Sequence, residues 1–225
     1  VVGYTSDGVA VTAGQLGAVG AMAALLSQAI KPNLVQTTEG APAFVHGGPF
    51  ANIAHGTNSI TATRAALSYA DIVVTEAGFA FELGAEKFFD INCRYGGFAP
   101  ACTVLVTTIR ALKMHGGKPL AEVSKPDVEA MTRGFSNMEK HIESIRKFGQ
   151  ACVVAINGFP TDTAEEVAAL QQHCARLGVE AVPAEPFSKG GSGCVELAKV
   201  VRDLAARTDP GFKPPYEWSD TIEHK

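Results

Sequence analysis

Short apolar segments alternate along this chain with segments of helical character, and loops containing glycine or proline follow most of the apolar segments. The segments expected to form strands are residues 33–37, 43–45, 71–75, 103–107, 151–156 and 179–182. The segments expected to form helices are residues 13–30, 57–70, 126–148, 163–177 and 194–206, with a further helix through Glu86 to Phe88. Repetition of strand, loop and helix predicts an α/β fold in which a parallel sheet is flanked by helices.

Open parallel sheets bind ligands beyond the carboxyl ends of their strands, so the loops at those ends are the candidate site. The loops in question lie at His46 and at residues 76–79, 110–117, 157–162 and 187–193. We therefore expect one edge of the sheet to carry the functional loops. A stretch rich in Gly, Pro, Ser and Lys between His115 and Lys125 predicts a boundary between a first domain, residues 1–120, and a second, residues 121–225.

The loop that begins His46-Gly47-Gly48 concentrates polar chemistry, because it also carries Asn52 and His55. Two adjacent glycines allow positive φ angles and a close approach of the backbone to a ligand. Thr57, Asn58 and Ser59 are candidates to cap the helix that follows. Backbone N–H groups and the dipole of that helix favour an anion here. The alternative is a structural turn whose histidines bond to backbone carbonyls.

The composition excludes several other functions. A net charge of −4, without a cluster of Lys or Arg, argues against a nucleic-acid partner. The longest apolar stretches, such as residues 151–156, are too short to span a bilayer, and residues 1–4 do not resemble a signal peptide. Five cysteines without zinc-ligand spacing predict reduced thiols in a cytoplasmic protein, and no metal site.

Several uninterrupted blocks resemble formate–tetrahydrofolate ligase. These blocks are Pro32–Thr37, Val45–Gly56, Val74–Phe79, Leu83–Phe88, Arg110–Gly117, Glu139–Glu143 and Ala155–Asn157. The resemblance implies a P-loop NTPase-like fold, ligation of formate to tetrahydrofolate with ATP and Mg²⁺ through formyl phosphate, and a homo-oligomer. It further suggests a monovalent cation as an additional ligand. Small molecules are the implied partners.

The phosphate-loop pattern G-x-x-x-x-G-K-[ST] does not occur in the 225 residues, and Gly117-Lys118-Pro119 does not satisfy it. The chain is therefore expected to be an internal portion of the family subunit: the later part of the ATP-binding domain and the α/β domain that follows. By itself it is expected to be inactive. The alternative is a non-catalytic fragment or paralogue that only binds folate or mediates oligomerisation.

The resemblance also assigns roles to residues. Phe79 and Pro160 match residues that line the pterin slot, and Phe187 stands where the family usually has Trp. Ala80 replaces a usual Gly, and Phe81 a usual small residue, which is expected to reshape the slot.

The chemistry needs donors for phosphate and for the tetrahedral oxyanion. The candidates are the N–H groups of Gly47, Gly48 and Gly78. His46 is a candidate acid or base, and Asn52 and His55 are candidate orienting groups. Lys87 and Arg94 either touch substrate or form helical ion pairs with Glu86 or Asp90.

Overall fold

The computed structural model describes residues 1–48, 55, 57–207 and 211–225. The chain divides into two compact units, unit 1 (Val1–Glu76) and unit 2 (Ala77–Lys225), and each is described by itself. Asn52 lies outside the described residues, as does most of the loop after Gly48.

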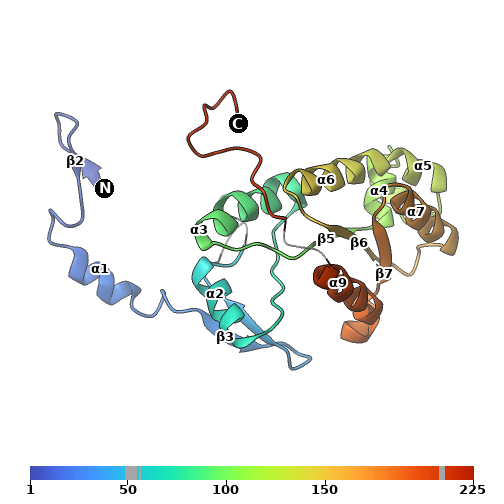
Figure 1. The fold of residues 1–225 in the computed structure, drawn as a ribbon, viewed down its shortest axis with the longest axis horizontal. Helices are drawn as coiled ribbons and strands as arrows, with labels where there is room; N and C mark the ends of the chain where they lie inside the picture. Colours follow the sequence, from blue (N-terminus) through green and yellow to red (C-terminus); the bar gives the residue numbers. More distant parts are fainter. Residues whose placement is uncertain (49–54, 56, 208–210) are drawn as a thin grey trace. The chain divides into compact units, whose positions relative to one another are not determined.

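Unit 2 contains a parallel sheet of three strands, in the order β5-β6-β7 (Figure 1). The strands are β5 (Thr103–Thr107), β6 (Cys152–Asn157) and β7 (Glu180–Ala184). Thr107 pairs with Ile156, and Asn157 pairs with Ala184, so the carboxyl ends of all three strands lie at one edge. The central strand is the most buried, as expected for a run of β-branched and apolar residues. The parallel α/β architecture predicted from the sequence is thus confirmed for this part of the chain.

Helices flank this sheet (Figure 1). The helices of unit 2 are α3 (Arg94–Gly96), α4 (Ile109–His115), α5 (Val128–Arg133), α6 (Phe135–Lys147), α7 (Ala164–Arg176), α8 (Pro186–Lys189) and α9 (Val195–Arg207). The single helix predicted over residues 126–148 is wrong in one respect, because α5 and α6 meet at Gly134. There the backbone comes so close to α4 that a Cβ on Gly134 would lie 1.9 Å from the Leu112 carbonyl oxygen.

Two apolar clusters hold unit 2 together. The first packs α4 to α7 against the sheet and includes Ile109, Met131, Ile142 and Leu170. The second is aromatic and joins residues 80–93, which form two π-helical segments, to the end of α6. In this second cluster Phe81, Phe89 and Phe148 pack with ring centroids 4.9–5.9 Å apart.

Unit 1 departs from the predicted parallel sheet. It contains β1 (Gly3–Tyr4), β2 (Ala10–Val11), α1 (Val19–Leu26), β3 (Asn33–Gln36), β4 (Pro42–Val45) and α2 (Ile60–Tyr69). Both β1–β2 and β3–β4 are antiparallel. Residues 37–41 close the β3–β4 hairpin with a bond from the Thr37 N–H to the Ala41 carbonyl (2.8 Å). So short a connection cannot make the crossover that a parallel pair requires.

The predicted strand at residues 71–75 is also wrong. This segment has no regular secondary structure, and Ile72 and Val74 are 68% and 86% exposed. β-branched residues favour an extended backbone, but a strand also needs a hydrogen-bonding neighbour, and the described residues offer this segment none.

The compact units divide at Glu76/Ala77, whereas the sequence placed a domain boundary at 120/121. β5, from the predicted first domain, pairs with β6, from the predicted second. The assignment of ATP binding to residues 1–120 and of folate binding to residues 121–225 stays a prediction. In the described part of the chain, no helix is long and apolar enough to cross a membrane.

Candidate functional site

Three loops meet at the carboxyl edge of the sheet in unit 2. They follow β5, β6 and β7: Thr108 with the first turn of α4, the loop Gly158–Thr163, and Glu185 with the short helix α8. This confirms that three of the predicted functional loops share one edge. The loop at His46 belongs to unit 1 and follows a strand of an antiparallel hairpin, so it is not part of this edge of the sheet.

The loop after β6 is held in shape by its own hydrogen bonds. The Asp162 carboxylate accepts the N–H of Phe159 (2.9 Å), and the Asp162 N–H donates to the Phe159 carbonyl (2.9 Å). The Gly158 N–H donates to the carbonyl of Ala184 at the end of β7 (2.9 Å). The turn therefore leaves Pro160 exposed, where a ligand could contact it.

Arg110 joins the loop after β5 to the loop after β6. It lies in the first turn of α4, whose N-cap Thr108 accepts the N–H of Ala111. The Arg110 guanidinium lies over the Phe159 ring, 4.0 Å from its centroid, and its Nη2 donates to Thr161 Oγ1 (3.1 Å). The sequence placed Arg110 in a candidate loop without giving it a role, and nothing in the local pattern indicates the stacking partner.

Phe187 is completely exposed in the loop after β7. It lies in the four-residue helix α8, which is closed by an ion pair between Lys189 and Glu185. The Glu185 N–H also donates to the Gly193 carbonyl (3.0 Å), which ties the two ends of the loop together. A fully exposed Phe on an ordered turn contributes nothing to the core of this unit.

Phe79 is 68% exposed and begins the helical segment 80–96. Gly78 before it has a φ of +70°, and Ala80 after it has a φ of +48°. The turn lies tightly on the helical segment, because a Cβ on Gly84 would come within 1.6 Å of the Ala77 carbonyl oxygen. Gly78 therefore adopts a conformation suited to glycine, and Ala80 adopts one that L-residues avoid.

A cavity of about 200 Å³ connects this turn with the sheet edge. Ala80 lines it together with Thr107 and Thr108 at the end of β5, and with His115 and His141 from α4 and α6. Ala80, which follows Phe79, and the carboxyl end of β5 thus border one cavity. Phe81 does not enter it: its side chain is 3% exposed and packs in the aromatic cluster. The extra volume of Phe81 therefore fills the core.

His46, in unit 1, is bonded at both ring nitrogens. Its Nε2 donates to the Ala29 carbonyl (2.9 Å), and its Nδ1 lies 2.6 Å from Ser59 Oγ. Ser59, one of the three predicted capping candidates, is the N-cap of α2, and its Oγ accepts the Ala62 N–H. These contacts support the structural alternative, in which His46 positions the start of α2. Gly47 and Gly48 have φ angles of +79° and +50°, as their sequence predicts. His55 is half-buried.

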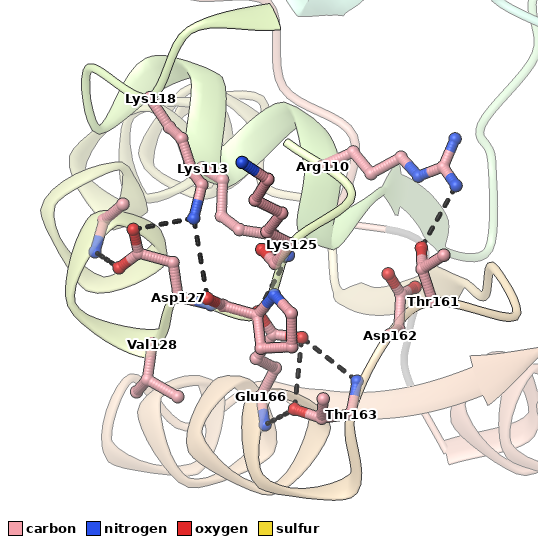
Figure 2. A network of polar contacts seen from close by, with 12 residues as sticks. Arg110, Lys113, Lys118, Lys125, Asp127, Val128, Thr161, Asp162, Thr163 and Glu166 are labelled. Carbon is pink, nitrogen blue, oxygen red and sulfur yellow. Dashed lines mark hydrogen bonds and ion pairs between the residues drawn. The ribbon is translucent and has the colours of Figure 1, made fainter. Parts of the chain in front are cut away.

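A buried ion pair supports the sheet edge (Figure 2). Lys113 Nζ on α4 lies 2.8 Å from Glu166 Oε1 on α7, and both side chains are 0% exposed. The same carboxylate accepts the N–H groups of Asp127 (2.9 Å) and Thr163 (3.0 Å). Burial raises the pKa of Glu166, but the bonds from Lys113 and these two amides outweigh it and lower that pKa below its usual 4.5.

Only one part of this network is visible in the sequence. Thr163 and Glu166 form a capping box, a pattern that a Thr followed three residues later by Glu indicates. Lys113 lies in an unremarkable helical segment, and only the fold shows that it is buried. Neither Lys113 nor Glu166 is among the candidate site residues that the sequence indicates.

The other residues that the sequence singled out, Arg94 and the cysteines, have contacts or burial typical of structural residues. Arg94 lies 3.9 Å from Asp90, the ion pair that the sequence offered as one alternative, and 4.4 Å from the Trp218 ring centroid. All five cysteines are free, as predicted. Burial raises the pKa of Cys93 and of Cys152 to about 12, so these thiols stay protonated and unreactive. No group of three metal-ligating side chains occurs among the residues that the structure describes.

The site in unit 2 is therefore an edge of a parallel sheet with exposed aromatic side chains, a stacked arginine and an adjoining cavity. The family model described as formate--tetrahydrofolate ligase matches residues 1–225. Members of this family are carbon–nitrogen ligases that use ATP and tetrahydrofolate. Because the match covers the whole chain, this protein belongs to the formate–tetrahydrofolate ligase family.

Proposed function

We propose that the chain is part of an enzyme that ligates formate to tetrahydrofolate with ATP, giving 10-formyltetrahydrofolate through formyl phosphate. The family match over residues 1–225 carries this proposal. The substrates are small molecules, the location is the cytoplasm, and the active protein is a homo-oligomer with a P-loop NTPase-like ATP-binding domain.

Tetrahydrofolate binds in a slot formed by Phe79, Pro160 and Phe187. Each of these side chains is exposed in unit 2, and Pro160 and Phe187 follow neighbouring strands. A flat pterin ring gains from contact with aromatic faces, and each such contact contributes about 1 kcal/mol beyond its area burial. Unbound aromatic faces on ordered turns are consistent with this use.

The phosphate chemistry is assigned to backbone donors. The N–H groups of Gly47, Gly48 and Gly78 bind phosphate or the tetrahedral oxyanion, with Asn52 and His55 as orienting groups. His46 acts through the placement of α2, because both its ring nitrogens already have partners. Mg²⁺ accompanies ATP, and a monovalent cation is a further ligand of the enzyme. Its phosphate loop lies outside these 225 residues, which lack the pattern.

The absence of that pattern favours a second candidate function, in which the chain only binds folate or mediates oligomerisation. Product formation distinguishes the two. The 225-residue chain with ATP, Mg²⁺, formate and tetrahydrofolate is expected to make no 10-formyltetrahydrofolate above background, whereas a full-length protein that contains it turns over. A full-length protein that binds tetrahydrofolate without turnover supports the second function.

The folate slot is tested by Phe79→Ala. Loss of one stacking face should weaken tetrahydrofolate binding about tenfold, measured by isothermal titration calorimetry on the full-length protein, with ATP affinity unchanged. Tyr95→Ala is the matched control, because Tyr95 is 65% exposed in the same unit and its ring packs against Trp218 instead, with centroids 4.7 Å apart. Equal effects of the two changes, or a parallel loss of ATP affinity, would contradict the slot assignment.

A further inference from the structure

Arg110 has hydrogen-bonding capacity that its own protein does not use. A guanidinium carries five N–H donors in a fixed planar fork. One of them, on Nη2, is given to Thr161 Oγ1, while Nε is buried without a partner. Nη1 has no hydrogen bond to any part of the chain that the structure describes, and Figure 2 shows Nη1 pointing away from the buried network.

Arg110 also lacks a carboxylate to balance its charge. Within residues 1–48, 55, 57–207 and 211–225 it forms no ion pair, whereas Lys113, three residues along, is paired with Glu166. The acidic residue in the loop that it touches, Asp162, directs Oδ2 to the Phe159 N–H, and its Oδ1 is buried without a partner. Arg110 therefore remains a cation available at the sheet edge.

The stacking on Phe159 fixes how this cation is presented. The guanidinium carbon lies over the Phe159 ring, 4.0 Å from its centroid, and Nη2 is bonded to Thr161, so two contacts hold the guanidinium in place. An arginine held in this way loses little further entropy when it binds an oxyanion through Nη1 and the second Nη2 hydrogen. Arg110 contacts Phe159 and Thr161, the residues on either side of Pro160, so its guanidinium lies beside the loop that carries Pro160.

We propose that Arg110 binds an oxyanion of a substrate held at the carboxyl edge of the sheet. This inference rests on the proposed function. The ligand group is a planar carboxylate or a tetrahedral phosphate, and either one can accept hydrogen bonds from a guanidinium. The substrates carry both kinds of group: tetrahydrofolate has glutamate carboxylates, and ATP has phosphates. The position of Arg110 beside Pro160 makes the glutamate carboxylate the first source to test.

The test uses Arg110→Met, which keeps a long apolar stem on Phe159 and removes the charge, and Arg110→Lys, which keeps the charge without the fork. Binding of tetrahydrofolate and of tetrahydropteroate, which lacks the glutamate, is measured by calorimetry on the full-length protein. The wild type should bind tetrahydrofolate about 10- to 100-fold more tightly than tetrahydropteroate, the range for a charge-assisted hydrogen bond. Arg110→Met should bind both alike, with tetrahydropteroate affinity unchanged, and Arg110→Lys should be intermediate.

A separate measurement of ATP binding tests whether the oxyanion is a phosphate. If Arg110→Met weakens ATP binding tenfold or more and leaves adenosine binding unchanged, the oxyanion is a phosphate, which supports the inference with the second source. If neither the preference for glutamate nor ATP affinity changes, the inference is overturned. Arg133→Met is the matched control, because Arg133 is an exposed arginine paired with Glu129 (2.8 Å) and should leave all affinities unaltered.

This experiment separates failure of the inference from failure of the proposed function. A wild-type protein that binds tetrahydrofolate and tetrahydropteroate equally, with ATP affinity insensitive to Arg110, retains the proposed function and loses the Arg110 site. A wild-type protein that binds neither pterin contradicts the proposed folate slot itself. Thermal unfolding of each variant shows whether lost binding follows lost folding.

Discussion

Units 1 and 2 both contain apolar segments, but they differ in how many apolar side chains they bury. Helix α1 of unit 1 reads Val-Gly-Ala-Met-Ala-Ala-Leu-Leu, yet none of its residues is buried. Of the hydrophobic residues that the structure describes as buried, Ala62 alone belongs to unit 1, and the rest lie in unit 2. Apolar side chains make a core only where other elements cover them, and unit 2 provides a sheet and helices to do so.

Glycine shows the same contrast. In unit 2, Gly84, Gly116 and Gly134 allow backbones to touch, and an added Cβ would lie 1.6–1.9 Å from a carbonyl oxygen. In unit 1, Gly47 and Gly48 have positive φ angles and open space around them. Gly84, Gly116 and Gly134 of unit 2 therefore serve close packing, whereas Gly47 and Gly48 of unit 1 set the direction of the chain.

The largest expected effect comes from the buried ion pair. Lys113→Met leaves Glu166 buried without its cation and should destabilise unit 2 by about 3–5 kcal/mol. The exchange of the β6 amides reports this loss, while the α2 amides of unit 1 should be unaffected. Lys140→Met, in an exposed pair with Glu143, is the control and should have no measurable effect.

The same pair carries a pH dependence with a defined sign. The pKa of Glu166 is lower in the folded protein than its usual 4.5, so its contribution is complete above that pH. This stability is lost as the pH falls below 4.5 through the folded pKa. Glu166→Gln should remove this part of the acid dependence. An unchanged acid profile, or a harmless Lys113→Met, would contradict the role assigned to the pair.

A smaller effect separates the two uses of glycine. Gly134→Ala must push α5 and α6 away from α4 and should destabilise unit 2 by about 1–3 kcal/mol or more. Gly47→Ala meets only the unfavourable φ angle, which corresponds to about 1–2 kcal/mol and should be confined to unit 1. Amide exchange in α4 measures the loss of stability in unit 2, and exchange in α2 measures the loss in unit 1. If each substitution destabilised both units equally, the two glycines would not have the separate roles assigned to them.

The smallest effect concerns the turn beside the proposed folate slot. Ala80 has a φ of +48°, so Ala80→Gly should relieve strain and stabilise unit 2 by about 1 kcal/mol, raising its unfolding temperature. Ala65→Gly, in the middle of α2, is the control and should destabilise unit 1 by a similar amount. A destabilising Ala80→Gly would show that the Cβ of Ala80 contributes contacts that outweigh the strain.

Local patterns predicted the elements of unit 2 closely. Residues 103–107 form β5 as expected, 152–157 form β6, and the Thr163 cap begins α7. In each case the signal is local: β-branched runs, a capping residue, and glycine or proline at the ends. The exposed positions of Phe79 and Phe187 agree with the predicted folate slot, but the roles of these residues remain predictions.

Those local patterns did not predict which strands pair with each other. The sequence indicated strands at 33–37 and 43–45 but not that they pair antiparallel, and it gave no sign that 71–75 would lack a neighbour. Strand pairing depends on which segments meet in three dimensions, and a β-branched run has the same local preference with or without a partner.

By itself, the sequence determined the family, the parallel α/β character of unit 2 and the position of its loops after strands. These follow from motifs and periodicity that are written in consecutive residues. Only the tertiary structure decided that Lys113 is buried against Glu166, that Arg110 lies over Phe159, and that Phe81 fills the core. Burial and pairing join residues that are distant in sequence, so their energies arise only when the fold brings those residues together.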